Sequence, residues 1–329
     1  MRGRTFIAAL LVLGAVALGA SWFGFSGRQG LTPVHPESSS AQGIDDLYKF
    51  IGIFAVAILL SVIVPLALIL GRYRQRGLPR EVDGPQIVGH TRLELFWTAI
   101  PVLIVLVISG FALYKASDIR NPSSAEGAPA TLKVHVEGRQ FYWRYVYPGG
   151  VIALDRLRLP LDQVVDLEVT APDTDVVHSF WVPALAGKVD AIPGQTNHLK
   201  FRPEQLGKYD GKCAELCGLQ HAAMTFDVEV LPRQEFEQWL TSQRTSQGKG
   251  TQLGNEQFQQ VCSKCHFAAP EFAPNIATSP LLGDAEAIRT LVTQGRGRMP
   301  AVGRGWSEKE LDALTRYLAT IALGGASGG

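Results

Sequence analysis

The pattern of apolar and polar positions divides the chain into an apolar N-terminal part and an alternating C-terminal part. Residues 50–71 and 95–114 contain no charged side chain, and each is about as long as the ~20 residues that cross a bilayer as a helix. Pro65 and Pro101 are compatible with such helices, because neighbouring helices or water can satisfy the carbonyls that a proline frees. The pattern predicts a transmembrane α-helical hairpin over residues 46–118. Core helices of a soluble protein are the alternative, which the lengths disfavour.

The ends of this apolar region suggest how it is oriented. Arg2 and Arg4 precede the apolar run 6–20, which predicts a signal peptide over residues 1–26, with an uncleaved anchor as the alternative. Arginines gather in the loop between the two long apolar segments, which places this loop in the cytoplasm by the positive-inside bias; they are Arg72, Arg74, Arg76, Arg80 and Arg92. We therefore expect a two-helix protein of a bacterial cell membrane, with its C-terminal part on the periplasmic or extracellular side.

From residue 131 to 232 the apolar period changes to two. Alternating stretches such as 132–136, 164–170 and 197–201 are separated by turn signals, of which Pro148-Gly149-Gly150 is the clearest. Short alternating strands with glycine and proline breaks predict an all-β sandwich or barrel, which we assign to residues 125–235.

The remaining chain predicts a linker and a small all-α domain. Residues 236–250 pass into a Ser-, Gln- and Gly-rich stretch that is typical of a linker. Residues 307–323 have helical apolar spacing and begin with the Ser-x-x-Glu pattern of a capping box at Ser307 and Glu310. We assign residues 251–325 to this domain.

Composition adds two facts. The 329 residues carry 31 basic and 30 acidic side chains, a net charge of +1, so there is no sign of a nucleic-acid partner. Sulfur is rare: the chain has four cysteines and three methionines, and apart from Met1 each lies in or near a candidate cofactor motif. A chain that uses sulfur so sparingly is not using it to fill the core.

Residues 213–224 are the first such motif. This stretch supplies two thiols at Cys213 and Cys217, an imidazole at His221 and a thioether at Met224. Soft sulfur ligands together with imidazole favour copper. A single-copper electron-transfer site needs only one cysteine, so the second cysteine here allows two coppers to be bridged. A second histidine is needed, and His178 lies in an alternating apolar stretch. A disulfide or a zinc site are the alternatives, although neither needs Met224 or a distant histidine.

The second motif is Cys262-Ser-Lys-Cys265-His266, the attachment signature of a c-type haem. In such a site two thioethers fix the porphyrin and His266 becomes an axial ligand. A redox or zinc motif is the alternative, but no cysteine or histidine follows His266 to complete a zinc site. Met299 is then the natural sixth ligand, in a Met-Pro sequence that resembles the loop of small monohaem cytochromes c.

Three segments carry a family resemblance: Asp175-Val-Val-His178-Ser, Asp190-Ala-Ile-Pro-Gly194 and residues 213–224 together resemble the copper-A domain of cytochrome c oxidase subunit II. The resemblance implies a cupredoxin-like Greek-key barrel. It also implies a ligand set, in which Cys213 and Cys217 bridge two coppers, His178 and Met224 bind one, and His221 and the Glu215 carbonyl bind the other. The Glu215 carboxylate matches the family's ligand for a magnesium ion shared with subunit I.

Two further stretches resemble the same family. Residues 93–101 are similar to its second membrane helix, where the glutamate corresponding to Glu94 lies at the mouth of a proton path; favourable interaction with the helix dipole is the plain alternative. Residues 140–145 resemble its aromatic run near the surface that receives electrons, which assigns Phe141 and Trp143 there. The family usually has tryptophan at the position of Phe141, which weakens a direct approach of soluble cytochrome c to copper.

Together these motifs predict an electron-transfer subunit. We expect a subunit II with a fused cytochrome c that takes electrons from a cytochrome c or a membrane donor complex. Its partners would be subunit I, which reduces oxygen and pumps protons, and subunit III. A copper-A subunit of a nitric oxide reductase is the enzymatic alternative, and a membrane-tethered copper carrier or redox sensor is the alternative from another class. A nitrous oxide reductase would need a propeller domain, and a quinol oxidase subunit lacks these copper ligands.

Overall fold

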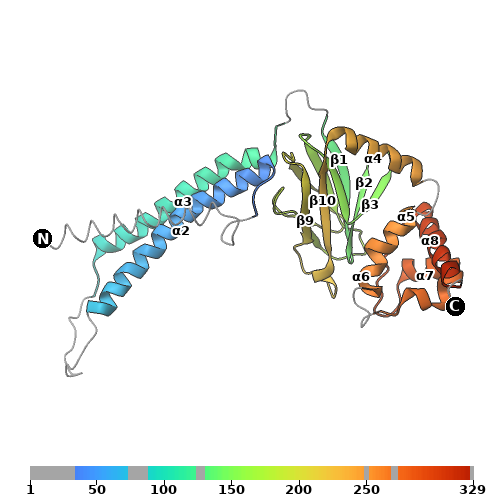
Figure 1. The fold of residues 1–329 in the computed structure, drawn as a ribbon. Coiled ribbons are helices and arrows are strands. Elements are labelled where there is room, and N and C mark those ends of the chain that lie inside the picture. The colour runs from blue at the N-terminus through green and yellow to red at the C-terminus, as the bar shows by residue number, and fades with distance from the viewer. Residues whose placement is uncertain (1–33, 73–87, 124–129, 248–251, 268–272, 327–329) are drawn as a thin grey trace, which may run out of the picture. The chain divides into compact units, whose positions relative to one another are not determined.

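The computed structural model describes residues 34–72, 88–123, 130–247, 252–267 and 273–326 (Figure 1). The predicted signal peptide and Arg74, Arg76 and Arg80 of the cytoplasmic loop lie outside these residues. The chain divides into two compact units, one built on the apolar helices and the other on residues 36–41 and the chain from Arg120 onward.

The first unit is the predicted hairpin. Helices α2 (Ser39–Arg72) and α3 (Thr91–Arg120) are both long and apolar enough to cross a membrane. Phe50 near the start of α2 stacks on Phe111 near the end of α3, with ring centroids 4.2 Å apart. Lys115 and Asp46 form an ion pair of 2.8 Å at the same end. The helices are therefore antiparallel, and the predicted hairpin is confirmed.

The second unit begins with a β-sandwich of two five-stranded sheets. One sheet has the order β3-β2-β1-β5-β8 and the other β4-β10-β9-β6-β7. Neighbouring strands are antiparallel except for the pairs β1–β5 and β4–β10, which are parallel. The strands are β1 (Leu132–Arg139), β2 (Tyr142–Tyr147), β3 (Val151–Leu154), β4 (Arg156–Pro160), β5 (Val165–Thr170), β6 (His178–Trp181), β7 (Val189–Ala191), β8 (Asn197–Phe201), β9 (Gly207–Cys213) and β10 (Thr225–Leu231).

Alternation along the strands fills the space between the sheets. Residues 132, 134 and 136 of β1 are buried while 133 is exposed, which is the period expected of a strand with one face on the core. Trp143, Phe180 and Phe226 meet at the centre, where the rings of Phe180 and Phe226 stack at 4.6 Å. The predicted cupredoxin-like all-β domain is confirmed, as two facing sheets.

Helix α4 (Arg233–Ser246) follows the sandwich and occupies most of the segment that the sequence indicated as a linker. The helix therefore extends much further along this segment than the Ser- and Gln-rich composition suggested. Phe236 and Trp239 of α4 pack against Tyr147 of β2, with Trp239 edge-on at 5.1 Å, so aromatic burial holds this segment in helical form.

The C-terminal part is all-α, as predicted. A continuous helical stretch of α5 (Gln252–Gln257), η2 (Phe258–Cys262) and α6 (Ser263–His266) is followed by the short helices η3 (Ile276–Thr278) and η4 (Pro280–Gly283) and by α7 (Ala285–Gln294) and α8 (Glu308–Ala326). Gly254 lies where α5 crosses α8, and a Cβ there would be 2.0 Å from the Ala313 carbonyl oxygen. The predicted capping box is present, since Ser307 N–H donates to the Glu310 carboxylate at 2.9 Å.

Candidate functional site

One end of the sandwich gathers the residues of the 213–224 motif. His178 begins β6 and Cys213 ends β9, and these strands are antiparallel neighbours in one sheet. The loop from 214 to 224, with η1 (His221–Ala223), then returns to β10. The predicted second histidine therefore lies beside the motif although it is 35 positions from Cys213.

The two thiols lie at the centre of this group. Their sulfurs are 3.9 Å apart and both cysteines are free, so they do not form a disulfide. Around Cys213 lie His178 Nδ1 at 3.9 Å and the Glu215 carbonyl at 3.2 Å. Around Cys217 lie His221 Nδ1 at 3.5 Å and Met224 Sδ at 3.6 Å.

This donor set fits two coppers better than one zinc. Structural zinc sites take four nitrogen, sulfur or carboxylate ligands, whereas here two thiols, two imidazoles, a thioether and a carbonyl converge. Thiolate, thioether and imidazole ligands suit copper. The residues expected to bind copper are thus brought together, with both thiols placed to bridge.

Neighbouring polar groups orient His178. Its Nε2 lies 3.1 Å from Asp175 Oδ1, and the other carboxylate oxygen accepts a hydrogen bond from the Gln140 backbone N–H at 3.2 Å. Burial lowers the pKa of His178, but its hydrogen bonds with Asp175 and Cys213 outweigh burial and raise it. Asp175 therefore directs Nδ1 toward the thiols, as partners of metal-binding histidines commonly do.

The thiol pair is prepared to lose a proton. The hydrogen bond between the two thiols lowers the pKa of Cys213, despite opposing burial, and raises the pKa of Cys217. A thiolate is the form that binds metal, so the lowered pKa of Cys213 favours the form that a metal site needs.

The aromatic run of residues 140–145 is placed differently from the expectation. Trp143 is fully buried, edge-on to the His178 ring at 6.1 Å, so it packs beneath the site and does not lie at the surface. Gln140 donates from Nε2 to the Cys217 carbonyl at 2.6 Å. Phe141, the next residue, lines a large cavity between the sandwich and the C-terminal helices.

That cavity is formed mostly by the all-α part and has a volume of about 770 Å³, within the ~300–1,000 Å³ typical of cofactor sites. All four predicted haem residues line it, namely Cys262, Cys265, His266 and Met299. Its other walls are largely apolar, formed by Ile288, Leu291, Val292, Leu314 and Leu318. The volume, the apolar lining and the donors fit a covalently attached haem.

His266 is held by its backbone surroundings. Its Nδ1 lies 2.5 Å from the Pro274 carbonyl oxygen. A protonated Nδ1 donating to this carbonyl leaves Nε2 as the free donor atom, the arrangement that fixes the tautomer of metal-binding histidines.

The copper and haem motifs share a wall. Gln140, Phe141, Leu219 and Gln220 come from the sandwich, yet they line the same cavity as the haem residues. Because Gln140 also donates to the Cys217 carbonyl, this one side chain touches both the cavity and a predicted copper-bridging cysteine.

Glu94 and Glu215, the two glutamates with predicted roles, belong to no cluster suited to a metal among the described residues. The Glu94 carboxylate accepts a hydrogen bond from the His90 backbone N–H at 3.0 Å, at the start of α3, so it caps that helix. The Glu215 side chain is exposed. Among the described residues, the one cluster suited to a metal is His178 with the two cysteines. The magnesium expectation thus depends on the family resemblance alone.

Sequence reasoning missed several residues of this region. Asp175 and Gln140 belonged to recognised motifs but were given no part in ligand orientation. Lys264 stands between the haem-attachment cysteines, and its side chain reaches the sandwich. The position of Lys264 between the two haem-attachment cysteines was the feature of the sequence that could have identified it as a residue near the haem.

Comparison with known proteins gives three family matches along the chain. Residues 29–114 match the cytochrome c oxidase subunit II transmembrane domain, and residues 150–231 match the periplasmic domain of the same subunit. Residues 250–318 match the family described as cytochrome c oxidase, cbb3-type, subunit III.

Individual proteins are similar over most of the chain. Cytochrome c oxidase subunit 2 of Alkalihalophilus pseudofirmus is 30% identical, over 91% of this chain and 93% of its own length. The Bacillus subtilis protein of that name is 29% identical, over 77% of both chains. Among solved structures, the periplasmic domain of subunit II of cytochrome oxidase of Bradyrhizobium japonicum has 31% identity and a TM-score of 0.33, covering 35% of this chain and 94% of its own.

Proposed function

Because the chain belongs to the cytochrome c oxidase subunit II family, we propose that it is the subunit through which electrons enter a terminal oxidase. Its haem domain receives electrons from a cytochrome c or a membrane donor complex, and its copper domain delivers them to subunit I for oxygen reduction coupled to proton pumping. When bound, the haem and the two coppers supply one-electron redox chemistry at potentials that their ligands set.

The shared wall between the two sites is the observation that carries this proposal. Gln140 and Phe141 line the haem cavity, and Gln140 bonds the carbonyl of Cys217. A copper carrier would need an open metal site and has no use for a second redox cavity directly behind its thiols. Two adjoining redox sites in one compact unit instead suit transfer between them.

The side chains around the two sites have distinct roles in this function. Asp175 holds the His178 ring, and the buried rings of Trp143, Phe180 and Phe226 exclude water behind it. A dry, rigid setting limits the movement of ligands between redox states. Phe141, on the cavity wall, is the proposed point at which electrons cross from the haem domain to the copper domain.

Finer assignments extend the proposal to the partner subunits. Glu94 is proposed to lie at the cytoplasmic mouth of the proton path into subunit I. There its carboxylate would leave the hydrogen bond with the His90 backbone N–H and face the path. Glu215 contributes one exposed carboxylate to a magnesium site completed by subunit I, and subunit III completes the assembly. These assignments rest on the family resemblance.

The test is the activity of the assembled complex. The chain is purified with its membrane partners, copper and iron contents are measured, and consumption of oxygen and of nitric oxide is followed with reduced cytochrome c. We expect oxygen uptake, with two coppers and one covalent haem in this chain. Nitric oxide consumption without oxygen uptake would assign the chain to the reductase alternative, and a zinc-loaded protein would remove the copper assignment.

A further inference from the structure

The haem domain completes its core with residues of the sandwich. Tyr142, Ile152 and Leu154, from β2 and β3, belong to one buried cluster with apolar residues of the helices. The Trp306 indole donates to the Tyr142 hydroxyl at 2.9 Å, and that hydroxyl donates to the Val302 carbonyl at 2.7 Å. The two domains therefore meet over a continuous apolar contact in which the Trp306 indole and the Tyr142 hydroxyl are paired.

Lys264 makes the contact nearest to both redox sites. Its ammonium lies 2.6 Å from Asp155 Oδ2 and donates to the carbonyls of Phe141 and Thr225 at 3.2 and 3.3 Å. All three acceptors belong to the sandwich, and together they match the three N–H donors of a lysine. The Lys264 side chain is only 17% exposed and that of Asp155 2%, so this ion pair is largely shielded from water.

Asp155 is built into the sandwich to receive this charge. Its carboxylate is 2% exposed, and its other oxygen accepts the Trp143 backbone N–H at 2.7 Å. A buried carboxylate is costly unless it is paired. The partner comes from the haem-attachment motif, so docking of the haem domain supplies the missing charge.

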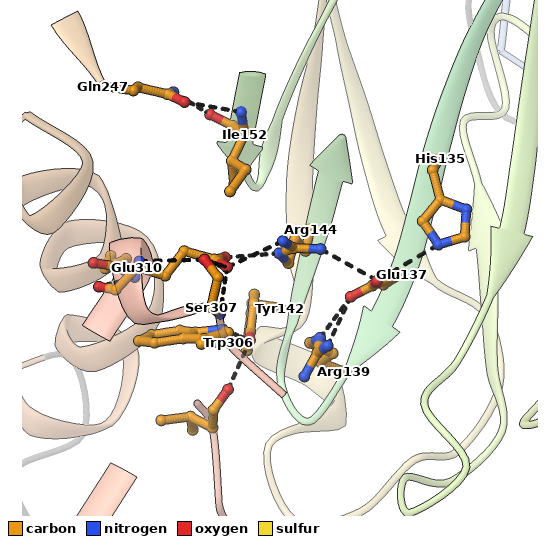
Figure 2. A network of polar contacts seen from close by, with 12 residues as sticks. His135, Glu137, Arg139, Tyr142, Arg144, Ile152, Gln247, Trp306, Ser307 and Glu310 are labelled. Atoms are coloured by element: carbon orange, nitrogen blue, oxygen red, sulfur yellow. Dashed lines mark hydrogen bonds and ion pairs between the residues drawn. The ribbon is translucent and has the colours of Figure 1, made fainter. Parts of the chain in front are cut away.

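A second ionic contact lies further along the same interface (Figure 2). Arg144 of β2 binds the Glu310 carboxylate with two hydrogen bonds, of 2.8 and 3.2 Å. Figure 2 also shows Glu137 bridging Arg139 and Arg144. The carboxylate of Glu137 lies 2.8 Å from Arg139 and 3.2 Å from Arg144. Since Glu310 caps α8, this contact anchors the helix that forms one wall of the haem cavity. Two separated anchors define an orientation, which one alone would not.

We propose that Lys264 is a positioning residue that fixes the haem-attachment motif against the copper domain, so that electrons cross between the two sites from one docked arrangement. This inference rests on the proposed function. Lys264 has an attachment cysteine two positions before it and another directly after it, and it holds Phe141, whose neighbour Gln140 contacts Cys217. Electron transfer slows steeply with distance, so a lysine at this point controls the spacing directly.

The experiment compares Lys264→Met with Lys309→Met in the full-length, cofactor-loaded chain. Lys309 is an exposed lysine of the same domain and serves as the matched control. Three quantities are measured: the haem spectrum and copper resonance, to verify loading; the relaxation of the copper resonance by oxidised haem, which reports their distance; and the rate of haem-to-copper electron transfer after flash reduction.

We expect Lys264→Met to keep both cofactors, lose most of the relaxation enhancement and transfer electrons at least about tenfold more slowly, because the buried pair is broken. Lys309→Met should match the parent protein. Lys264→Gln retains an N–H donor for the two carbonyls and should be intermediate; it provides the measurement if the methionine variant does not accumulate.

Unchanged relaxation and an unchanged rate in either Lys264 variant would overturn the positioning role. A parent protein that binds both cofactors but exchanges no electron between them would instead refute the proposed function, so the two failures are distinguishable.

Discussion

The Gln140 side chain donates a hydrogen bond to the backbone carbonyl of Cys217 over 2.6 Å, although the two residues are 77 positions apart. Gln140 also lines the haem cavity. The bond therefore links the cavity wall to the loop that carries four of the expected copper ligands.

Replacing Gln140 by leucine should disturb the copper site and leave the haem attached. Loss of this bond leaves the backbone carbonyl of the buried Cys217 without this partner, which costs about 1–3 kcal/mol and loosens Cys217. We expect a changed copper resonance and a lower free energy of unfolding, measured by denaturant titration. Gln163→Leu is the control, because Gln163 bonds the exposed Ala130 carbonyl away from both sites. An unaltered copper resonance in Gln140→Leu would show that the loop from 214 to 224 keeps its conformation without the bond to Gln140.

Cys217→Ser tests the bridging assignment. Cys217 contacts three other predicted ligands, Cys213, His221 and Met224, so its loss should abolish the mixed-valence copper resonance. Covalent haem, judged by the visible spectrum of the denatured chain, should remain at the parent level. Persistence of the mixed-valence resonance would contradict a shared thiolate.

Met299→Ala tests the sixth ligand of the haem. Met299 lines the cavity with His266, and methionine ligation raises the reduction potential of a haem relative to ligation by two histidines. We expect attached haem with a lower midpoint potential and an altered visible spectrum. If redox titration and spectrum match those of the parent protein, Met299 is a packing residue.

The features that could be predicted from the sequence are those that depend on residues close together along the chain. The two apolar segments, the alternation in β1, the Ser307–Glu310 cap and the two cofactor motifs all depend on residues within one helix, strand or loop. His178 was a candidate because the site needs a second histidine and because it lies in an alternating apolar stretch. Its assignment to a particular copper took the family resemblance, since 35 positions separate it from Cys213.

Contacts across the domain interface could not be predicted in the same way. Arg144 and Glu310 are 166 positions apart, and nothing in the spacing around either residue identifies the other. The same interface explains why Tyr142 is buried although its neighbour Trp143 fills the sandwich core. Tyr142 and Trp143 are both fully buried, because one faces the sandwich core and the other the haem domain. Period-two reasoning expects only one of two neighbours inside.

Asp155 should give the protein a specific pH dependence. Burial raises the pKa of Asp155 to about 6, although Lys264 and the Trp143 N–H oppose it. Between about pH 4 and 6 Asp155 therefore keeps its proton in the folded chain and has lost it in the unfolded chain. The contribution of Asp155 to the free energy of unfolding falls as the pH rises through this window. The change amounts to about 3 kcal/mol. Subtracting the unfolding free energy of Asp155→Asn from that of the parent, across pH 4–7, isolates it; a pH-independent difference would contradict the raised pKa.

Glu310→Gln should weaken the domain interface more than a nearby surface substitution. Glu310 is 1% exposed and Arg144 12%, and removing one charge of a buried pair costs about 3–5 kcal/mol. Glutamine keeps an oxygen to cap α8, so the loss reports the ion pair. Glu308→Gln is the matched control, because Glu308 is 82% exposed in its pair with Arg289 and should cost at most about 1 kcal/mol. Denaturant titration of both variants gives the comparison, and equal losses would mean that Arg144 finds another partner, with Glu137 already 3.2 Å away.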